Sequence, residues 1–218
     1  MAAMPASPFA HPLPPQPFPL ILRDVACARG EARVFAGLDL TVDAGGLWLI
    51  RGANGAGKTT LLRLLAGLLK PQRGAGLWSD GRAPRAAPER ALLVGHQDAL
   101  KPALSVAENL GFWARFLGVA ENPWPQAADP FGVWALADVP VRMLSAGQKR
   151  RVSLTRLAFS RAPLWLLDEP TTALDAAGQR IVWELIALHR RRGGAAVVTT
   201  HAKGTVEGAS ELVLGEAR

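Results

Sequence analysis

The stretch Arg51-Gly52-Ala53-Asn54-Gly55-Ala56-Gly57-Lys58-Thr59-Thr60 decides the fold of this chain of 218 residues. Apolar residues 47–50 precede it and a leucine-rich segment, 61–69, follows it, so the pattern predicts a strand, a glycine-rich loop and a helix. The spacing of its glycines, lysine and threonine fits the phosphate-binding motif G-x-x-x-x-G-K-[ST]. Glycines let the backbone turn tightly and direct its N–H groups at phosphate oxygens. Residues 52–60 are therefore predicted to bind a nucleoside triphosphate, with Lys58 on its terminal phosphates and the Thr59 hydroxyl on Mg²⁺.

The composition narrows the class of protein. A hydrophobic share of 49% supports a substantial core, and the single Cys27 excludes an internal disulfide framework. The net charge of +7 would suit nucleic acid, anionic lipid or an acidic partner, but the arginines are scattered, as on solvated helix faces. No run reaches the ~18 uncharged apolar residues that a membrane span needs. Residues 1–19 hold seven prolines and no basic n-region, which predicts a disordered Pro-rich tail and not a signal peptide.

Buried strands alternate with helices along the rest of the chain. This alternation favours a parallel sheet with crossover helices. A hairpin with an Asp-Gly turn is expected at 77–81, and residues 103–162 carry no strand pattern, so they are predicted to form an inserted helical subdomain. The strands are expected at 20–27, 34–42, 47–50, 92–94, 164–167, 195–200 and 211–214, and the longer helices at 105–118, 145–160 and 176–192.

Two acids, Asp168 and Glu169, end the fully apolar strand 164–167. An acid at the C-terminal end of such a strand lies where α/β sheets bind their ligands. Asp168 is predicted to hold Mg²⁺ through a water, and Glu169 to take a proton from an attacking water. The alternative is that both acids only cap the next turn, which the preceding phosphate loop disfavours.

With these motifs the chain resembles the ATP-binding subunits of ABC transporters. The segment Leu144-Ser145-Ala146-Gly147-Gln148 is similar to the LSGGQ signature of that family, with Ala146 in place of its first glycine. The resemblance implies ATP and Mg²⁺ as cofactors, and two copies bound head to tail, with Ser145, Gly147 and Gln148 capping the γ-phosphate of the opposite copy. It also implies an α/β fold of the P-loop NTPase type over residues 20–218, with a mostly parallel core sheet, an antiparallel β subdomain and the inserted helical subdomain.

Further positions match the family one by one. Gln97 takes the place of the glutamine that touches Mg²⁺ or the water, and Ala173-Leu174-Asp175 that of the loop at the dimer interface. His201 takes the place of the histidine that contacts the γ-phosphate and holds the catalytic acid. Arg29 stands where the family usually stacks an aromatic ring on adenine, and the chain has no Tyr. A guanidinium can stack on a base, so Arg29 is either the adenine contact or a solvated turn residue.

Within the family, residues 94–97, 101–109 and 138–148 are similar to those of the cytochrome c maturation ATPases, also called haem exporter ATP-binding proteins. This resemblance implies an ATP hydrolase that energises a multi-span membrane subunit at the cytoplasmic face of the bacterial inner membrane, with no nucleic-acid partner. The ATPase of another small ABC exporter is the first alternative. A soluble ABC ATPase of nucleic acid or ribosomes usually needs long insertions or two ATPase domains, which 218 residues do not hold. A nucleotide sensor without turnover is disfavoured by the presence of Glu169 and His201.

Overall fold

The computed structural model describes residues 13, 18–29, 32–118, 129–201 and 206–215. These residues fall into two compact units, each described by itself below. The sheet unit takes its described residues from 13–96, 162–170 and 188–215, and the helical unit from 97–161 and 171–187. The predicted Pro-rich tail over residues 1–19 lies almost wholly outside the described residues.

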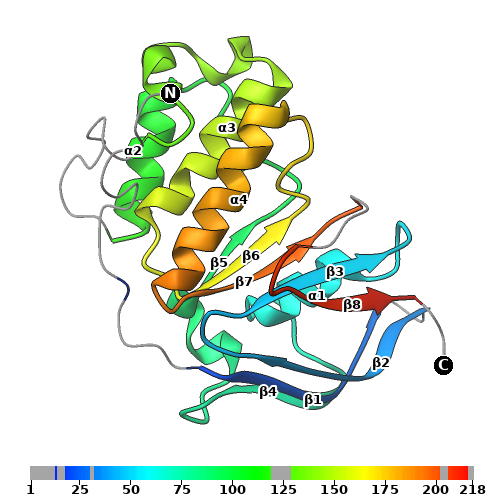
Figure 1. Ribbon diagram of the computed structural model, residues 1–218. Helices are drawn as coiled ribbons and strands as arrows, with labels where there is room; N and C mark the ends of the chain where they lie inside the picture. Colours follow the sequence, from blue (N-terminus) through cyan, green and yellow to red (C-terminus); the bar gives the residue numbers. More distant parts are fainter. Residues whose placement is uncertain (1–12, 14–17, 30–31, 119–128, 202–205, 216–218) are drawn as a thin grey trace. The chain divides into compact units, whose positions relative to one another are not determined.

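A five-stranded parallel sheet forms the centre of the sheet unit (Figure 1). Two neighbouring strands inside this sheet, Leu164–Asp168 and Ala195–Thr199, each consist of four apolar residues and a final polar residue. All of these residues are buried, as is typical of a parallel sheet that is covered on both faces. The predicted parallel core sheet is therefore confirmed. In spatial order the strands are β5 (Ala91–Val94), β6 (Leu164–Asp168), β7 (Ala195–Thr199), β3 (Leu47–Gly52) and β8 (Ser210–Leu214).

A second, antiparallel sheet has the order β2 (Ala32–Val42), β1 (Leu20–Arg29) and β4 (Arg73–Trp78). The expected turn after Trp78 forms, with the Arg82 N–H donating to Asp80 Oδ1 at 3.1 Å. The expected hairpin is nevertheless wrong, because β4 pairs with β1, and the next strand along the chain, Ala91–Val94, belongs to the parallel sheet. Pro84 and Pro88 instead begin two short 3₁₀ turns, since proline lacks the N–H that a ladder needs.

One hydrophobic core joins both sheets to helix α1 (Lys58–Leu65). Leu61, Leu62 and Leu65 of α1 are fully buried in this core, together with Leu20 and Leu22 of β1. The helix thus packs by its leucines directly after the glycine-rich loop. This packing fixes the loop between β3 and α1 at the C-terminal edge of the parallel sheet.

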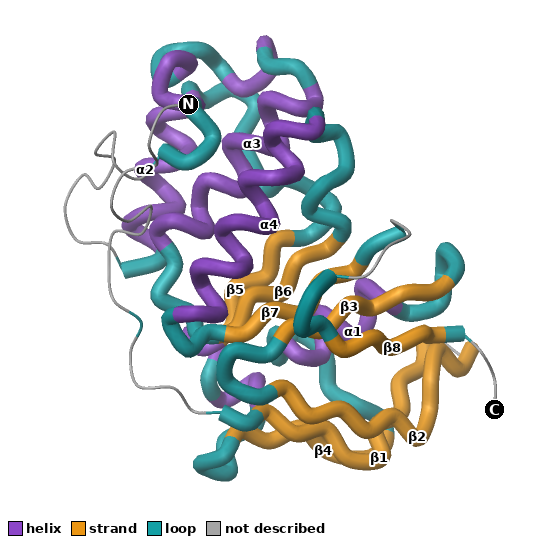
Figure 2. The backbone as a smooth tube through the Cα atoms, viewed as in Figure 1, coloured by secondary structure: helices purple, strands orange, loops and turns teal. Residues whose placement is uncertain are grey.

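The helical unit contains α2 (Val106–Phe116), α3 (Ala146–Thr155) and residues 176–187 of α4 (Ala176–Arg191), drawn as purple tubes in Figure 2. Short 3₁₀ segments lie at Val133–Leu136, Val141–Met143 and Arg156–Phe159. A capping box begins α2, since the Ser105 and Glu108 side chains each accept the other's backbone N–H. The unit also takes in residues 171–187, outside the predicted insertion. Among the described helices, none is long and apolar enough to cross a membrane.

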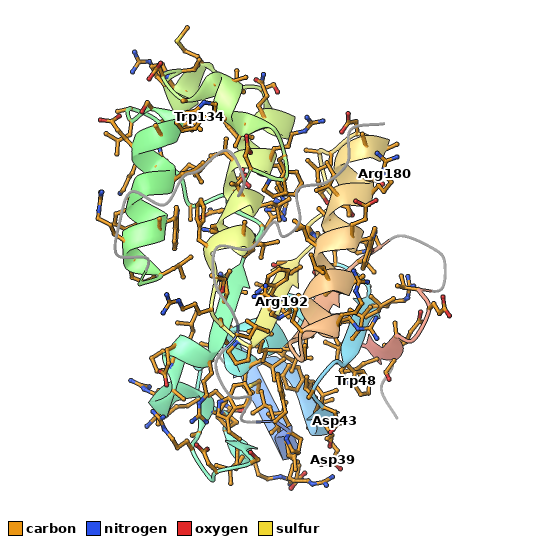
Figure 3. All side chains as sticks on the ribbon, turned by 60° about the vertical axis from the view of Figure 1, so that its left-hand side comes forward. Asp39, Asp43, Trp48, Trp134, Arg180 and Arg192 are labelled. Atoms are coloured by element: carbon orange, nitrogen blue, oxygen red, sulfur yellow. The ribbon has the colours of Figure 1, made fainter. Side chains whose placement is uncertain are left out.

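A buried histidine, His189, lies near the end of α4, where the chain turns toward β7 in the sheet unit. The His189 ring stacks on Trp165 with centroids 3.9 Å apart, and its Nε2 donates to the Pro163 carbonyl at 3.0 Å. A Cβ at Gly194 would lie 2.2 Å from Nε2, so glycine is required there. Burial lowers the pKa of His189 to about 4, and the nearby charge of Arg192, labelled in Figure 3, acts in the same direction.

His189 predicts an acid-sensitive contribution to stability. The unfolded chain, whose imidazole pKa is about 6.5, binds the proton at a higher pH than the folded chain does. The contribution is therefore complete above pH ~6.5 and is lost as the pH falls toward 4, by about 3 kcal/mol at most. Urea unfolding of wild type and His189→Phe between pH 7.5 and 4.5 measures it. The Phe variant, which keeps the stack, should lose less stability on acidification; parallel curves would contradict the assignment.

Candidate functional site

The glycine-rich loop has the geometry that its sequence predicts. Gly52, at the end of β3, has φ 142°, and a Cβ there would lie 2.4 Å from the Leu214 carbonyl oxygen of β8. Gly57, the N-cap of α1, has φ 99°, and a Cβ there would lie 2.3 Å from Cγ1 of Val34. Neither position accepts a side chain without rearrangement. The loop therefore passes tightly from strand to helix and leaves its backbone accessible.

Lys58 is held inside the loop at 7% exposure. Its Nζ donates to the carbonyl oxygens of Gly52 at 2.8 Å and Ala53 at 3.1 Å. Both acceptors are neutral, so an anionic oxygen would be a stronger partner for the same ammonium. The loop thus presents one pre-positioned positive charge at the N-terminus of α1.

Two hydroxyl groups fix the buried Asp168 side chain at the end of β6. The Thr59 hydroxyl donates to Oδ2 at 2.8 Å, and the Thr199 hydroxyl of β7 donates to Oδ1 at 2.7 Å. Asp168 itself is 4% exposed. The network joins the first turn of α1 to two strands of the parallel sheet. Thr59 and Asp168, predicted to bind the same cation, are therefore adjacent.

Glu169 is held by both its backbone and its carboxylate. Its N–H donates to Thr199 Oγ1 at 2.9 Å, and its Oε1 lies 2.8 Å from Nε2 of His201. The residue has φ 46°, a left-handed conformation that costs a non-glycine residue about 1–2 kcal/mol. Nε2 of His201 also lies 3.3 Å from Lys58 Nζ, so this nitrogen donates to Glu169 or accepts from Lys58, according to its tautomer.

These side chains surround one cavity of about 490 Å³ in the sheet unit. Most of the residues that line it were expected from the sequence, namely Asn54, Gly55, Gly57, Lys58, Thr59, Thr60, Asp168, Glu169 and His201. Val34 and His96 also line it and were not predicted, nor was Thr199, the shared anchor of the two acids. The place of Thr199 at the end of an apolar strand beside Asp168 was the available signal. The remaining loop residues Gly52, Ala53 and Ala56 form the turn without lining the cavity.

The other predicted site residues belong to the helical unit. Ser145 caps α3: its Oγ accepts the N–H of Gln148 at 3.2 Å, and its own N–H donates to Oε1 of Gln148 at 2.8 Å. A Cβ at Gly147 would lie 2.8 Å from the carbonyl oxygen of Ala173. Arg151 of α3 pairs with Asp175 at 2.7 Å, which lowers the pKa of that carboxyl. The signature segment and the 173–175 loop therefore form one contiguous surface.

Gln97 is the first residue of the helical unit, directly after the cavity-lining His96. Its neighbour Asp98 accepts from the buried Arg150 at 3.2 Å, and its carbonyl accepts from the Ser153 hydroxyl at 3.0 Å. Two contacts thus attach this segment to α3. Arg29 ends β1, but its side chain lies outside the described residues, so its contact with a base stays a prediction.

Fold and cavity together define a P-loop ATPase cassette, and comparison with known proteins agrees. The family model described as ABC transporter matches residues 35–172, and the chain belongs to that family. A Rhodospirillum rubrum protein named cytochrome c biogenesis ATP-binding export protein CcmA is 50% identical over 195 residues, which cover 88% of this chain and 83% of that protein. The protein of the same name in Paramagnetospirillum magneticum is 48% identical over 202 residues, covering 89% and 93%.

Solved structures share the fold. An ATP-binding subunit of an ABC transporter superposes with a TM-score of 0.80 at 23% identity, covering 90% of this chain and 86% of that one. The ATP-binding cassette MJ0796, solved as a dimer bound to ADP and phosphate, gives a TM-score of 0.69 at 25% identity, covering 84% and 88%. The predicted fold of the ABC ATPase type is thereby confirmed.

Proposed function

We propose that this chain is the ATP-binding and ATP-hydrolysing subunit of an ABC transporter complex that serves c-type cytochrome biogenesis. The observation that carries this proposal is one cavity in which Lys58, the Thr59–Asp168 pair and the Glu169–His201 pair meet. Relatives of about 50% identity that bear the cytochrome c biogenesis name support the pathway. Haem delivery to those cytochromes is the task we assign to the complex.

The loop binds the substrate through its charge and its amides. The N–H groups at the start of α1 and the Lys58 ammonium meet the β- and γ-phosphates of ATP. Lys58 exchanges its neutral carbonyl partners for phosphate oxygens, which are stronger acceptors. Binding therefore needs no large movement of this side chain.

The donor set beside the loop fits Mg²⁺. Thr59 and Asp168 offer oxygen ligands only, and hard cations of this size prefer oxygen. In the described part of the chain no group of three or more His, Cys, Asp or Glu side chains is placed to hold a metal by itself. Such a partial site suits an ion that enters with the phosphates and keeps several waters. The bound ion would neutralise charge on the transferred phosphoryl group.

Glu169 acts on the attacking water as general base. Its carboxylate faces the cavity at the end of β6 while Thr199 fixes its backbone. His201 orients that carboxylate through the 2.8 Å contact and stands beside Lys58, where the terminal phosphate binds. A base held in one position is what proton transfer in the transition state requires.

A second copy supplies the other half of the site. The Ser145 hydroxyl oxygen accepts a hydrogen bond from the Gln148 N–H of its own helix. Its hydroxyl hydrogen can donate to the γ-phosphate bound by the opposite copy. Gly147 and Gln148 at the same helix start and the 173–175 loop complete the contact between copies, whereas Gln97 would touch Mg²⁺ or the attacking water. The dimers formed by the related cassette MJ0796 support this arrangement.

The membrane partner and the location complete the proposal. The chain attaches to a multi-span membrane subunit at the cytoplasmic face of the bacterial inner membrane, as the export function in the relatives' names suggests. Binding and release of ATP between two copies would then change the distance between the attached membrane subunits.

Co-purification tests this proposal. The tagged chain, expressed in its native host, should bring down a multi-span membrane protein and should leave the membrane fraction when the gene of that protein is deleted. Loss of holo c-type cytochromes in a strain carrying Lys58→Ala is the expected phenotype. The proposal would be overturned if membrane binding and ATPase activity were both unchanged by the deletion. Salt-sensitive binding to nucleic acid would also overturn it.

A further inference from the structure

His96 stands at the same edge of the parallel sheet as the two acids. β5 lies beside β6 (Figure 1) and pairs with it in parallel, with Val94 opposite Leu167. His96 follows the end of β5 by two residues, at the edge of the sheet where β6 ends in Asp168 and Glu169 follows. His201 follows β7 on the other side of β6. Each of the two strands beside β6 is therefore followed by a histidine at the edge of the sheet where Glu169 lies.

The His96 ring is exposed and lines the cavity together with Lys58, Glu169 and His201. Within the described part of the chain it makes no hydrogen bond, ion pair or ring contact, whereas His189 of the same unit is buried, stacked and hydrogen-bonded. A structural histidine has such partners. His96 instead has both ring nitrogens available to whatever enters the cavity.

The described side chains that line the cavity carry more negative than positive charge, so a triphosphate would gain from another hydrogen-bond donor. One ammonium, Lys58, faces two carboxylates, Asp168 and Glu169. A triphosphate adds further negative charge, which one Mg²⁺ offsets only in part. Beyond Lys58, the Asn54 amide and the loop N–H groups, the two histidines are the nitrogen donors among the described side chains that line the cavity.

We propose that His96 is a substrate-binding residue of this site, donating a hydrogen bond to the terminal phosphate from the β5 side, opposite His201. The assignment rests on the proposed function, since it takes ATP as the occupant of the cavity. Because only the triphosphate carries that group, His96 distinguishes ATP from ADP. Lys58, which also meets the β-phosphate, contributes to binding of both.

Nucleotide affinity measured in the full-length chain tests the assignment. His96→Ala should weaken ATP binding about 10–100-fold, the loss expected for one hydrogen bond to a charged group, and leave ADP binding unchanged. His96→Gln, which keeps an N–H donor, should recover most of the ATP affinity. Glu89→Ala, at an exposed position outside the cavity lining, is the control and should bind both nucleotides as wild type does.

The outcomes separate this inference from the function on which it rests. ATP binding unchanged in His96→Ala, or equal loss of ATP and ADP binding, would overturn the role of His96. If Lys58→Ala still weakened both nucleotides, the proposed ATP site would stand in either case. Failure of the wild-type chain to bind ATP at all would instead remove the proposed function.

Discussion

Replacement of Glu169 by Gln should abolish ATP hydrolysis while ATP binding survives. The amide keeps the shape of the side chain and its contact with His201, but it cannot take a proton from water. Loss of a general base lowers turnover by roughly 10²–10⁴-fold. The measurement is phosphate release under saturating MgATP.

The same variant should accumulate as an ATP-bound dimer. If hydrolysis opens the contact between two copies, a chain that binds ATP without cleaving it stays closed. Light scattering with MgATP, with MgADP and without nucleotide measures this state. Glu184→Gln is the matched control, because Glu184 is a half-exposed residue of α4 whose carboxylate pairs with Arg180 one turn earlier on the same helix. Wild-type turnover in Glu169→Gln would remove Glu169 from the mechanism.

The backbone conformation of Glu169 requires that its surroundings hold it in place. A left-handed conformation at a non-glycine residue is unfavourable and persists only where the surroundings enforce it. Here the Thr199 hydroxyl accepts the Glu169 N–H and donates to Asp168. One side chain therefore orients the cation ligand and the general base together, and substitution of Thr199 would disturb both.

The parts of the site that were predictable are local in sequence. The loop 52–60 carries its strand, its turn and its helix within one window, and Asp168 and Glu169 follow a strand that is apolar throughout. Periodicity and glycine spacing identify such features because neighbouring residues determine them. The parallel sheet and the start of α3 at Ser145 were correct for the same reason.

What the sequence missed depends on residues far apart in the chain. β4 contains two glycines, which weaken the strand pattern in its sequence. Its partner in the ladder, β1, lies about fifty residues earlier in the chain. The expected hairpin failed because an Asp-Gly turn fixes a reversal of the chain without fixing a second strand. His96 carries no motif of its own, and only the register of β5 beside β6 brings it to the cavity.

Replacement of Lys58 by Ala should have the second large effect, on nucleotide affinity. Lys58 is the ammonium of the cavity lining, and it is already aimed into the loop by the Gly52 and Ala53 carbonyls. A hydrogen bond to a charged group contributes about 1.5–3 kcal/mol, so binding of ATP and ADP should weaken about 10–100-fold. Turnover at physiological ATP should fall accordingly.

The matched control for this change is Lys70→Ala, an exposed lysine beyond the end of α1, which should bind nucleotide normally. Thermal melting with and without MgATP separates binding from folding, because a ligand raises the melting temperature only of a chain that binds it. The Lys58 variant should melt near wild type without nucleotide and gain little from MgATP. A normal gain in stability would show that the phosphates are held without Lys58, and the loop would then act through its backbone amides alone.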